Sequence, residues 1–297
     1  MDMEHRFRGI FPENIRTIGL MSPSSPPNEP RIREGIRLLE DAGIKVKVGD
    51  HIFAAEVPGR PSAPLEGRLA DFRKLWNDPE VDMMIFTRGG EGMIQVVQAL
   101  DWAHEMPSRP EMWLSGFSDI TIMLCALQSH HICHPFAAPN LGSMVRADME
   151  TLAWLGDILH GRTPAPFPLE PLVKGDCEGI IMAGHMERLN RISATEFRPE
   201  TAGRILFIEC VNKTVAQLRS YMDGLLQKGF FVGAKGVVFC EFTDCTPDAD
   251  IPAMLEHYAP LLGCPVYKGF MFGHERRNLA LDLLRRASIR DGVLTML

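Results

Sequence analysis

Gly116-Phe117-Ser118-Asp119-Ile120-Thr121 joins a short apolar run, Met112-Trp113-Leu114, to an apolar segment with helical character, Ile122–Leu127. The six residues therefore predict a turn from a strand into a helix. A serine in such a tight turn can hold its hydroxyl clear of the backbone, and the free N–H groups of the helix N-terminus can bind a developing oxyanion. The common alternative is a Ser-Asp cap of the helix. Ser118 is thus either a nucleophile or a helix cap.

Strand and helix patterns alternate along the N-terminal half around this turn. The runs that predict strands are residues 16–21, 44–48, 81–86 and 112–115, and the segments between them carry apolar residues at helical spacing. Strands separated by helices form a parallel, wound sheet with flanking helices, and ligands bind such sheets at the carboxyl ends of the strands. The turns at Ser22, Gly89-Gly90 and Ser118 should therefore lie along one edge.

The second half of the chain starts again after a proline-rich stretch. Residues 161–174 contain four prolines, which is typical of a linker. Strand patterns then recur at 179–184, 205–209, 236–240 and 265–268. We therefore predict an α/β fold with an N-terminal domain over 1–160, a linker over 161–175 and a smaller C-terminal α/β domain over 176–297.

The overall composition argues against several classes of function. The net charge is −7 and no run of lysine or arginine occurs, so we expect no nucleic-acid partner. No apolar run approaches the roughly 18 residues that span a bilayer, and the charged start Met1–Arg6 has no apolar core behind it. We therefore expect neither a membrane partner nor a secretory signal. The seven cysteines form an odd set without a C-x-x-C pair, which favours reduced thiols and a cytoplasmic location.

His130-His131-Ile132-Cys133-His134 is a cluster that suggests a metal site. Adjacent residues of an extended segment point to opposite faces, however, and no second group with the spacing of zinc ligands follows. We therefore expect no metal and no cofactor.

Two residues of the second half could make Ser118 a nucleophile. A serine needs a base within hydrogen-bond reach, and the base needs an orienting partner. Glu209 ends an apolar strand, where an unpaired carboxylate is costly, and His274 follows Phe272-Gly273 in a loop. The Gly89-Gly90 turn would let backbone N–H groups approach a substrate carbonyl. Each feature also has a plainer interpretation: a solvated glutamate, an exposed histidine and an ordinary turn.

The block Arg88-Gly89-Gly90-x-Gly92, followed by Gly116–Thr121, resembles the LD-carboxypeptidase family of serine peptidases, which includes the microcin C self-immunity peptidases. Residues 205–209, 242–245 and Gly273-His274 are similar to later blocks of that family, so the resemblance covers most of the chain. It implies a triad of Ser118, Glu209 and His274, with the nucleophile in the first domain, and a homodimer. Because Ile120 stands where the G-x-S-x-G pattern needs glycine, an esterase or lipase is disfavoured.

Two positions depart from the family pattern where substrate could bind. Glu91 follows Gly-Gly where members often have an aromatic or polar residue, and Ala183-Gly184-His185-Met186 replaces the usual Gly-Gly-Asn-Leu. Gly89, Glu91 and His185 are therefore candidates for substrate binding, and the last two should face the cleft. An anionic Glu91 would attract a substrate ammonium, whereas a protonated His185 would favour an anion. The alternative for Glu91 is a carboxylate at a helix start, interacting with the helix dipole.

These inferences predict a metal-independent serine peptidase that acts on a small peptide-like substrate. Ser118 attacks, His274 relays the proton, Glu209 holds the imidazole, and the N–H groups of Gly90 and Asp119 form the oxyanion hole. The resemblance implies a murein peptide with an L–D bond before a terminal D-amino acid. The alternatives are an amide bond in a peptidyl- or aminoacyl-nucleotide and, in another class, a non-catalytic protein that binds a small ligand.

Overall fold

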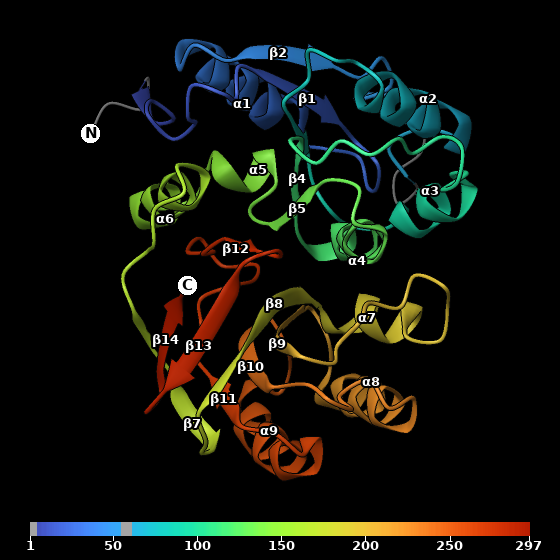
Figure 1. Ribbon diagram of the computed structural model, residues 1–297. Coiled ribbons are helices and arrows are strands. Elements are labelled where there is room, and N and C mark those ends of the chain that lie inside the picture. Colours follow the sequence, from blue (N-terminus) through green and yellow to red (C-terminus); the bar gives the residue numbers. More distant parts are fainter. Residues whose placement is uncertain (1–4, 55–60) are drawn as a thin grey trace.

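The computed structural model describes residues 5–54 and 61–297, and in these ranges the chain forms two β-sheets, one above the other in Figure 1, with helices packed on them. Most of the charged start, Met1–Arg6, lies outside the described residues, so its interpretation stays an expectation. No helix in the described ranges is both long and apolar enough to cross a membrane.

The first sheet is wound and parallel, as the alternating pattern predicts. Its order is β12-β5-β4-β3-β1-β2, and only the pair β12–β5 is antiparallel. Every residue of β1 and β3 is buried, so both faces of the sheet are covered. The strands are β1 Thr17–Met21, β2 Lys45–Val48, β3 Met83–Phe86, β4 Trp113–Gly116, β5 His134–Ala137 and β12 Leu281–Asp282. The helices are α1 Glu29–Asp41, α2 Leu65–Trp76, α3 Met93–Ala99, α4 Thr121–His130, α5 Leu141–Met144 and α6 Met149–Leu159.

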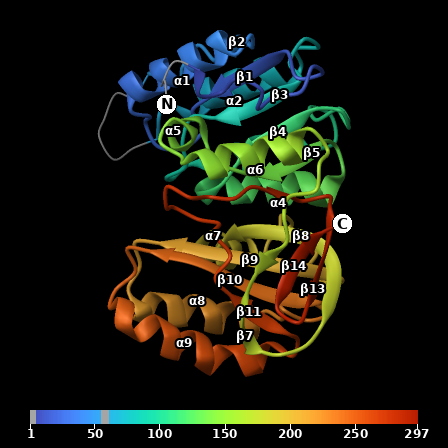
Figure 2. The same ribbon diagram turned by 90° about the vertical axis from the view of Figure 1, so that its left-hand side faces the viewer.

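The second sheet combines a parallel centre with antiparallel edges, in the order β6-β14-β13-β8-β9-β10-β11-β7. Strands β8 to β11 are parallel, and the other four pair antiparallel. Helices α8 and α9 lie on the side away from the first sheet, whereas α7 lies towards it (Figure 2). The strands are β6 Phe167–Pro168, β7 Glu170–Val173, β8 Cys177–His185, β9 Arg204–Val211, β10 Gly236–Thr243, β11 Val266–Lys268, β13 Arg286–Arg290 and β14 Val293–Met296. The helices are α7 Met186–Ile192, α8 Val215–Gln227 and α9 Ile251–Tyr258.

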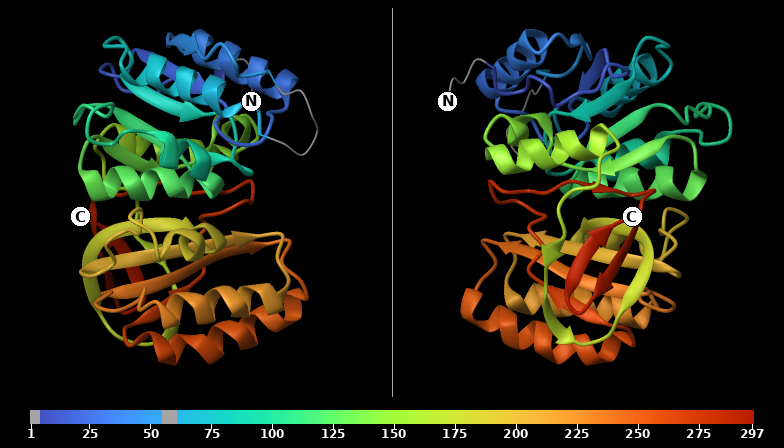
Figure 3. Two further views of the ribbon diagram at one scale, coloured as in Figure 1. Left: turned by 90° about the vertical axis from the view of Figure 1, so that its right-hand side faces the viewer. Right: turned by 60° about the vertical axis from the view of Figure 1, so that its left-hand side comes forward.

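The two halves of the chain are more interlaced than the sequence pattern indicates. Strands β6 and β7 lie within 161–175, so the segment expected as a linker adds two strands to the second sheet. Strand β12 returns from the C-terminal half to pair with β5, and the red segment between the sheets in Figure 3 makes this return. Buried apolar side chains from both sheets form one continuous cluster. The division into domains of 1–160 and 176–297 stays a prediction.

The turns after β1, β3 and β4 meet at the carboxyl edge of the first sheet. Ser22 Oγ lies 2.7 Å from Thr87 Oγ1, which joins the turns after β1 and β3. A Cβ placed on Gly89 would lie 2.8 Å from Ser118 Cβ, so the Gly89-Gly90 turn touches the turn after β4. This edge therefore gathers candidate residues that are far apart in the sequence.

Candidate active site

Ser118 occupies a strained elbow between β4 and α4. Its φ is +66°, in the left-handed region that non-glycine residues rarely adopt. One turn of 3-10 helix, Ser118–Ile120, leads directly into α4, and a Cβ on Gly116 would meet Ile120 at 2.7 Å. The close packing explains why glycine precedes the elbow. The predicted strand-to-helix turn is present, and it presents the hydroxyl to the space between the sheets.

Ser118, His274 and Glu209 form one hydrogen-bonded chain. His274 Nε2 lies 3.0 Å from Ser118 Oγ, and His274 Nδ1 lies 2.8 Å from Glu209 Oε2. Glu209 sits in β9 and is completely buried, whereas the side chain of His274 is 20% exposed in the loop after β11. The ring of Phe117 packs 4.8 Å from the ring of His274. This geometry lets Nδ1–H donate to the carboxylate while Nε2 accepts the serine proton.

Backbone N–H groups beside Ser118 are available to a ligand. Among the described residues, neither Gly90 N nor Asp119 N donates a hydrogen bond to the protein. Gly90 has a φ of +112°, which suits glycine, and a Cβ on Gly89 would lie 3.2 Å from Asp119 N. The close approach of the glycine turn thus leaves both amides free next to the serine, where they can bind a carbonyl oxygen.

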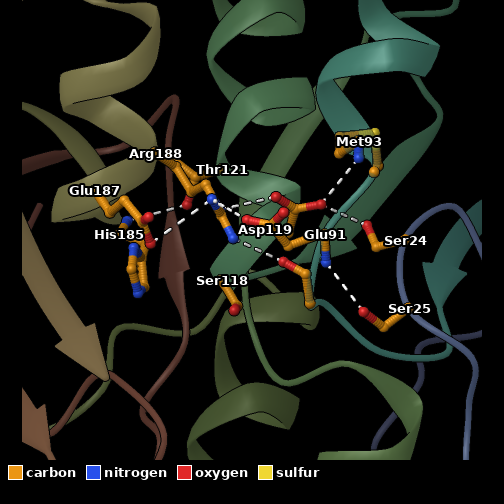
Figure 4. Close-up of polar contacts among 12 residues, drawn as sticks. Ser24, Ser25, Glu91, Met93, Ser118, Asp119, Thr121, His185, Glu187 and Arg188 are labelled. Atoms are coloured by element: carbon orange, nitrogen blue, oxygen red, sulfur yellow. Dashed lines mark hydrogen bonds and ion pairs between the residues drawn. The ribbon is translucent and has the colours of Figure 1, made fainter. Parts of the chain in front are cut away.

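A buried ionic network surrounds Asp119, the residue after the serine (Figure 4). Asp119 Oδ2 accepts hydrogen bonds from Ser24 Oγ at 2.7 Å and Met93 N at 2.9 Å. Arg188 Nε lies 2.8 Å from Asp119 Oδ1, an ion pair whose angle is not that of a hydrogen bond. Burial raises the pKa of Asp119, and the positive charge of Arg188 opposes that rise. Sequence reasoning missed Arg188, because an arginine in the first turn of a helix carries no local signal.

Glu91 and His185 do not line the pocket in front of Ser118, so the expectation that both face it is not met. The side chain of Glu91 is 70% exposed and pairs with Arg188 Nη1 at 3.0 Å. His185 is buried at the N-cap of α7, with its ring 5.9 Å from that of His274. Burial lowers the pKa of His185 to about 4, so the suggestion of a protonated His185 that favours anionic substrates is wrong at neutral pH.

The pocket beside Ser118 and His274 has a volume of about 240 Å³ and is rich in positive charge. Arg31, Arg88 and Arg146 line it, and no aspartate or glutamate is among its described lining residues. Burial and the nearby charges of Arg146 and Arg88 lower the pKa of Arg31. Such a pocket attracts an anionic group and repels an ammonium. The expected preference for a substrate amine near Glu91 therefore has no support in the geometry.

The histidines that suggested a metal cluster have separate partners. His130 stacks on Trp102 at 4.8 Å, and His134 Nε2 lies 2.7 Å from Asp282 Oδ1. His131 ends α4 in the left-handed conformation, with a φ of +53°. Within residues 5–54 and 61–297, no three histidine, cysteine, aspartate or glutamate side chains are grouped so as to hold a metal ion.

Two family models match this chain, one in each half, and together they cover more than half of it. The LD-carboxypeptidase N-terminal domain matches residues 18–137, and the LD-carboxypeptidase C-terminal domain matches residues 178–289. The chain is 25% identical to a probable murein peptide carboxypeptidase of Bacillus subtilis (strain 168), over 97% of this chain and 95% of the relative. It is 27% identical to the murein tetrapeptide carboxypeptidase of Pseudomonas aeruginosa, over 89% of each chain.

Solved structures with the same fold cover almost the whole chain. The muramoyltetrapeptide carboxypeptidase from Oxalobacter formigenes has a TM-score of 0.82 and 23% identity, over 94% of this chain and 97% of that one. The microcin C7 self immunity protein MccF has a TM-score of 0.82 and 20% identity, over 96% of both chains. At these identities the likeness establishes the fold alone.

Proposed function

The chain belongs to the LD-carboxypeptidase family of serine peptidases, and we propose that it removes a terminal D-amino acid from murein peptides by hydrolysing the preceding L–D amide bond. Membership of this family makes the protein a peptidase, which disfavours a non-catalytic binding protein. The observation that carries the proposed mechanism is the continuous chain from Glu209 through His274 to Ser118, with contacts of 2.8 and 3.0 Å.

In the acylation step, Ser118 Oγ attacks the carbonyl carbon of the scissile amide while His274 Nε2 takes the hydroxyl proton. Glu209 stabilises the imidazolium through Nδ1–H, and the carbonyl oxygen gains negative charge, which the N–H groups of Gly90 and Asp119 bind. When the C–N bond breaks, the imidazolium returns the proton to the leaving amine. The terminal amino acid departs and the rest of the peptide stays esterified to Ser118.

In the deacylation step, a water molecule enters where the amine left. His274 takes its proton, the resulting hydroxide attacks the ester carbonyl, and Ser118 leaves as an alkoxide that recovers the proton from the imidazolium. The second carboxylate product then dissociates. Both steps use the same base and the same two amides, so neither requires a metal ion.

The arginines of the pocket favour a substrate with a carboxylate close to the scissile bond. Arg31, Arg88 and Arg146 lie around the cavity that Ser118 and His274 also line. The leaving residue of a carboxypeptidase substrate carries a carboxylate on the α-carbon that is bonded to the departing nitrogen. Guanidinium groups bind carboxylates well. The charge of the pocket therefore supports cleavage at a chain end over cleavage inside a peptide.

Hydrolysis of an amide bond in a peptidyl- or aminoacyl-nucleotide would use the same triad and remains the alternative. One experiment separates the two: the purified protein is incubated in parallel with murein tetrapeptide, the same peptide with a C-terminal amide, and an aminoacyl-sulfamoyl adenosine. We expect release of the terminal D-amino acid from the tetrapeptide, at least tenfold slower cleavage of the amide, and no cleavage by Ser118→Ala. Faster hydrolysis of the nucleotide, or full activity of Ser118→Ala, would contradict the proposal.

We further infer that the protein is a cytoplasmic homodimer. The family resemblance supports the dimer, and all seven cysteines are free of disulfides, as suits a reducing compartment. Light scattering coupled to size-exclusion chromatography measures the assembly, and a monomeric mass at micromolar concentration would contradict the dimer. Fractionation of cells of the source organism tests the location.

A further inference from the structure

Arg188 contacts both segments that carry the free backbone amides, although it belongs to the other half of the chain. Its side chain is 8% exposed and extends from α7 to the first sheet (Figure 4). Nη2 donates to Gly90 O at 2.8 Å, and Nε lies 2.8 Å from Asp119 Oδ1. We propose that Arg188 is a positioning residue that fixes the two oxyanion-binding amides relative to Ser118. The inference rests on the proposed serine mechanism.

The same two segments are held from the opposite side by residues of the first half. Ser24 Oγ and Met93 N donate to Asp119 Oδ2, and Glu91 N donates to Ser25 Oγ at 3.1 Å. Each segment is therefore clamped between the loop after β1 on one side and Arg188 on the other. The buried side chains of Arg188 and Asp119 contact partners on both sides, so they have little freedom to rotate. The turns that they join therefore hold the amides of Gly90 and Asp119 at a fixed separation.

The arrangement requires a guanidinium group and not merely a positive charge. Nη2 donates to Gly90 O, Nε lies 2.8 Å from Asp119 Oδ1, and Nη1 lies 3.0 Å from Glu91 Oε1 and 3.6 Å from Glu187 Oε2. A planar guanidinium spreads its charge over three nitrogens and can contact these four oxygens at once, whereas a lysine ammonium is a single point at the end of a flexible stem. Arg188→Lys thus keeps the charge and loses the geometry.

Arg188 is also linked to the part of the chain that carries Glu209, the residue that orients the base His274. His185 ends β8 and is the N-cap of α7, and it is paired with Glu209 in the parallel register of β8 and β9. Three residues further on, Arg188 reaches Asp119 next to the nucleophile. The segment that supports Glu209 therefore also contacts the amide-bearing turns, so the residue that orients His274 and the oxyanion site are positioned by one part of the chain.

The test measures the rate at which a fluorophosphonate probe modifies Ser118, together with kcat and KM for the tetrapeptide. The phosphonyl oxygen of the probe occupies the oxyanion site, so the rate depends on the positions of both amides. For Arg188→Lys we expect labelling and kcat to fall by about 10- to 100-fold, with KM changed by less than about threefold, since an ångström of misplacement can slow an enzyme about 100-fold. A shift confined to KM would contradict a positioning role.

Arg204→Lys is the matched control, because Arg204 is as buried as Arg188 and begins the strand that carries Glu209, but contacts neither amide segment. We expect its labelling rate to stay within about twofold of the wild type. Equal losses in the two variants, or wild-type labelling of Arg188→Lys, would overturn the inference. Failure of the wild-type protein to label would instead refute Ser118 as the nucleophile.

A second variant guards against poor folding of Arg188→Lys. In Arg188→Gln combined with Asp119→Asn, both members of the buried ion pair are neutral, so no uncompensated charge is left in the interior. The double variant should fold and still label at least tenfold more slowly than the wild type. Recovery of the wild-type rate would show that the guanidinium is not needed to place the amides.

Discussion

Lowering the pH from 7 to 5 should remove about 2 kcal/mol of folding free energy through His185 alone. Burial lowers the pKa of this histidine to about 4 from its ordinary value of 6.5. Between these values His185 is protonated in the unfolded chain and neutral in the folded protein. The unfolded state binds more protons between these two values, and stability therefore falls as the pH falls through that range. The whole effect amounts to about 3 kcal/mol once the pH is below 4.

The assay is urea unfolding at pH 7 and pH 5, followed by tryptophan fluorescence, for the wild type and for His185→Asn. Asparagine is a good N-cap and does not titrate. Any cavity that it leaves therefore changes the free energy of unfolding by the same amount at pH 7 and at pH 5. The loss of stability from pH 7 to pH 5 should be about 2 kcal/mol smaller in the variant. His257→Asn, which replaces an exposed ring, should lose as much stability as the wild type.

An equal pH dependence in His185→Asn and the wild type would refute the reasoning, because it would mean that His185 takes up its proton as readily in the folded protein as in the unfolded chain. A steeper dependence in the variant would mean that the folded protein favours the imidazolium. Either result would remove the argument that His185 is neutral beside His274 at physiological pH.

The remaining predictions concern the reaction itself. Ser118→Ala should lower turnover on the order of 10⁶-fold with an unchanged circular dichroism spectrum, and residual activity near wild type would exclude the serine. Glu209→Gln should lower kcat on the order of 10⁴-fold, because the amide no longer fixes the tautomer of His274; a loss below tenfold would contradict the contact at 2.8 Å. Gly89→Ala should slow fluorophosphonate labelling at least about 100-fold, since its Cβ would lie 2.9 Å from Ser118 Oγ, whereas Gly156→Ala in α6, with 3.5 Å to its nearest atom, should not. Dialysis against a strong chelator should leave the rate unchanged, and loss of activity that zinc restores would refute a metal-free mechanism.

Local patterns predicted β1 to β4 and β8 to β11, because most of these strands are apolar runs bounded by turn formers, and they did not predict β5, β13 and β14. Residues 81–86 and 205–209, for example, contain or overlap β3 and β9. Strand β12 could not be predicted in this way, because two residues carry no periodicity and the pairing with β5 alone defines them. Strands β6 and β7 were hidden by prolines, which edge strands tolerate.

Some residues of the site could also be predicted from the neighbouring sequence, whereas others are recognised only from contacts that folding creates. The elbow at Ser118 could be inferred from its neighbours. Glu209 and His274 became candidates from their places at a strand end and in a loop, and the family resemblance joined them to Ser118 as a triad. No local pattern indicated Arg188, because its role depends on contacts with Gly90 and Asp119, which lie in the other half of the chain. The convergence of Arg31, Arg88 and Arg146 is equally a product of folding, and it reversed the charge preference inferred from Glu91 alone.

Because β12 comes late in the sequence and pairs with β5, the first sheet can be completed only near the end of synthesis of the chain. Until residue 282 has been synthesised, β5 is an open sheet edge that can pair with other strands. His274 lies only a few residues before β12, so the hydrogen-bond partner of Ser118 and the last strand of the first sheet are synthesised in the same short stretch of the chain. An unfinished chain therefore lacks both the hydrogen-bond partner of Ser118 and the strand that covers the open edge of the first sheet.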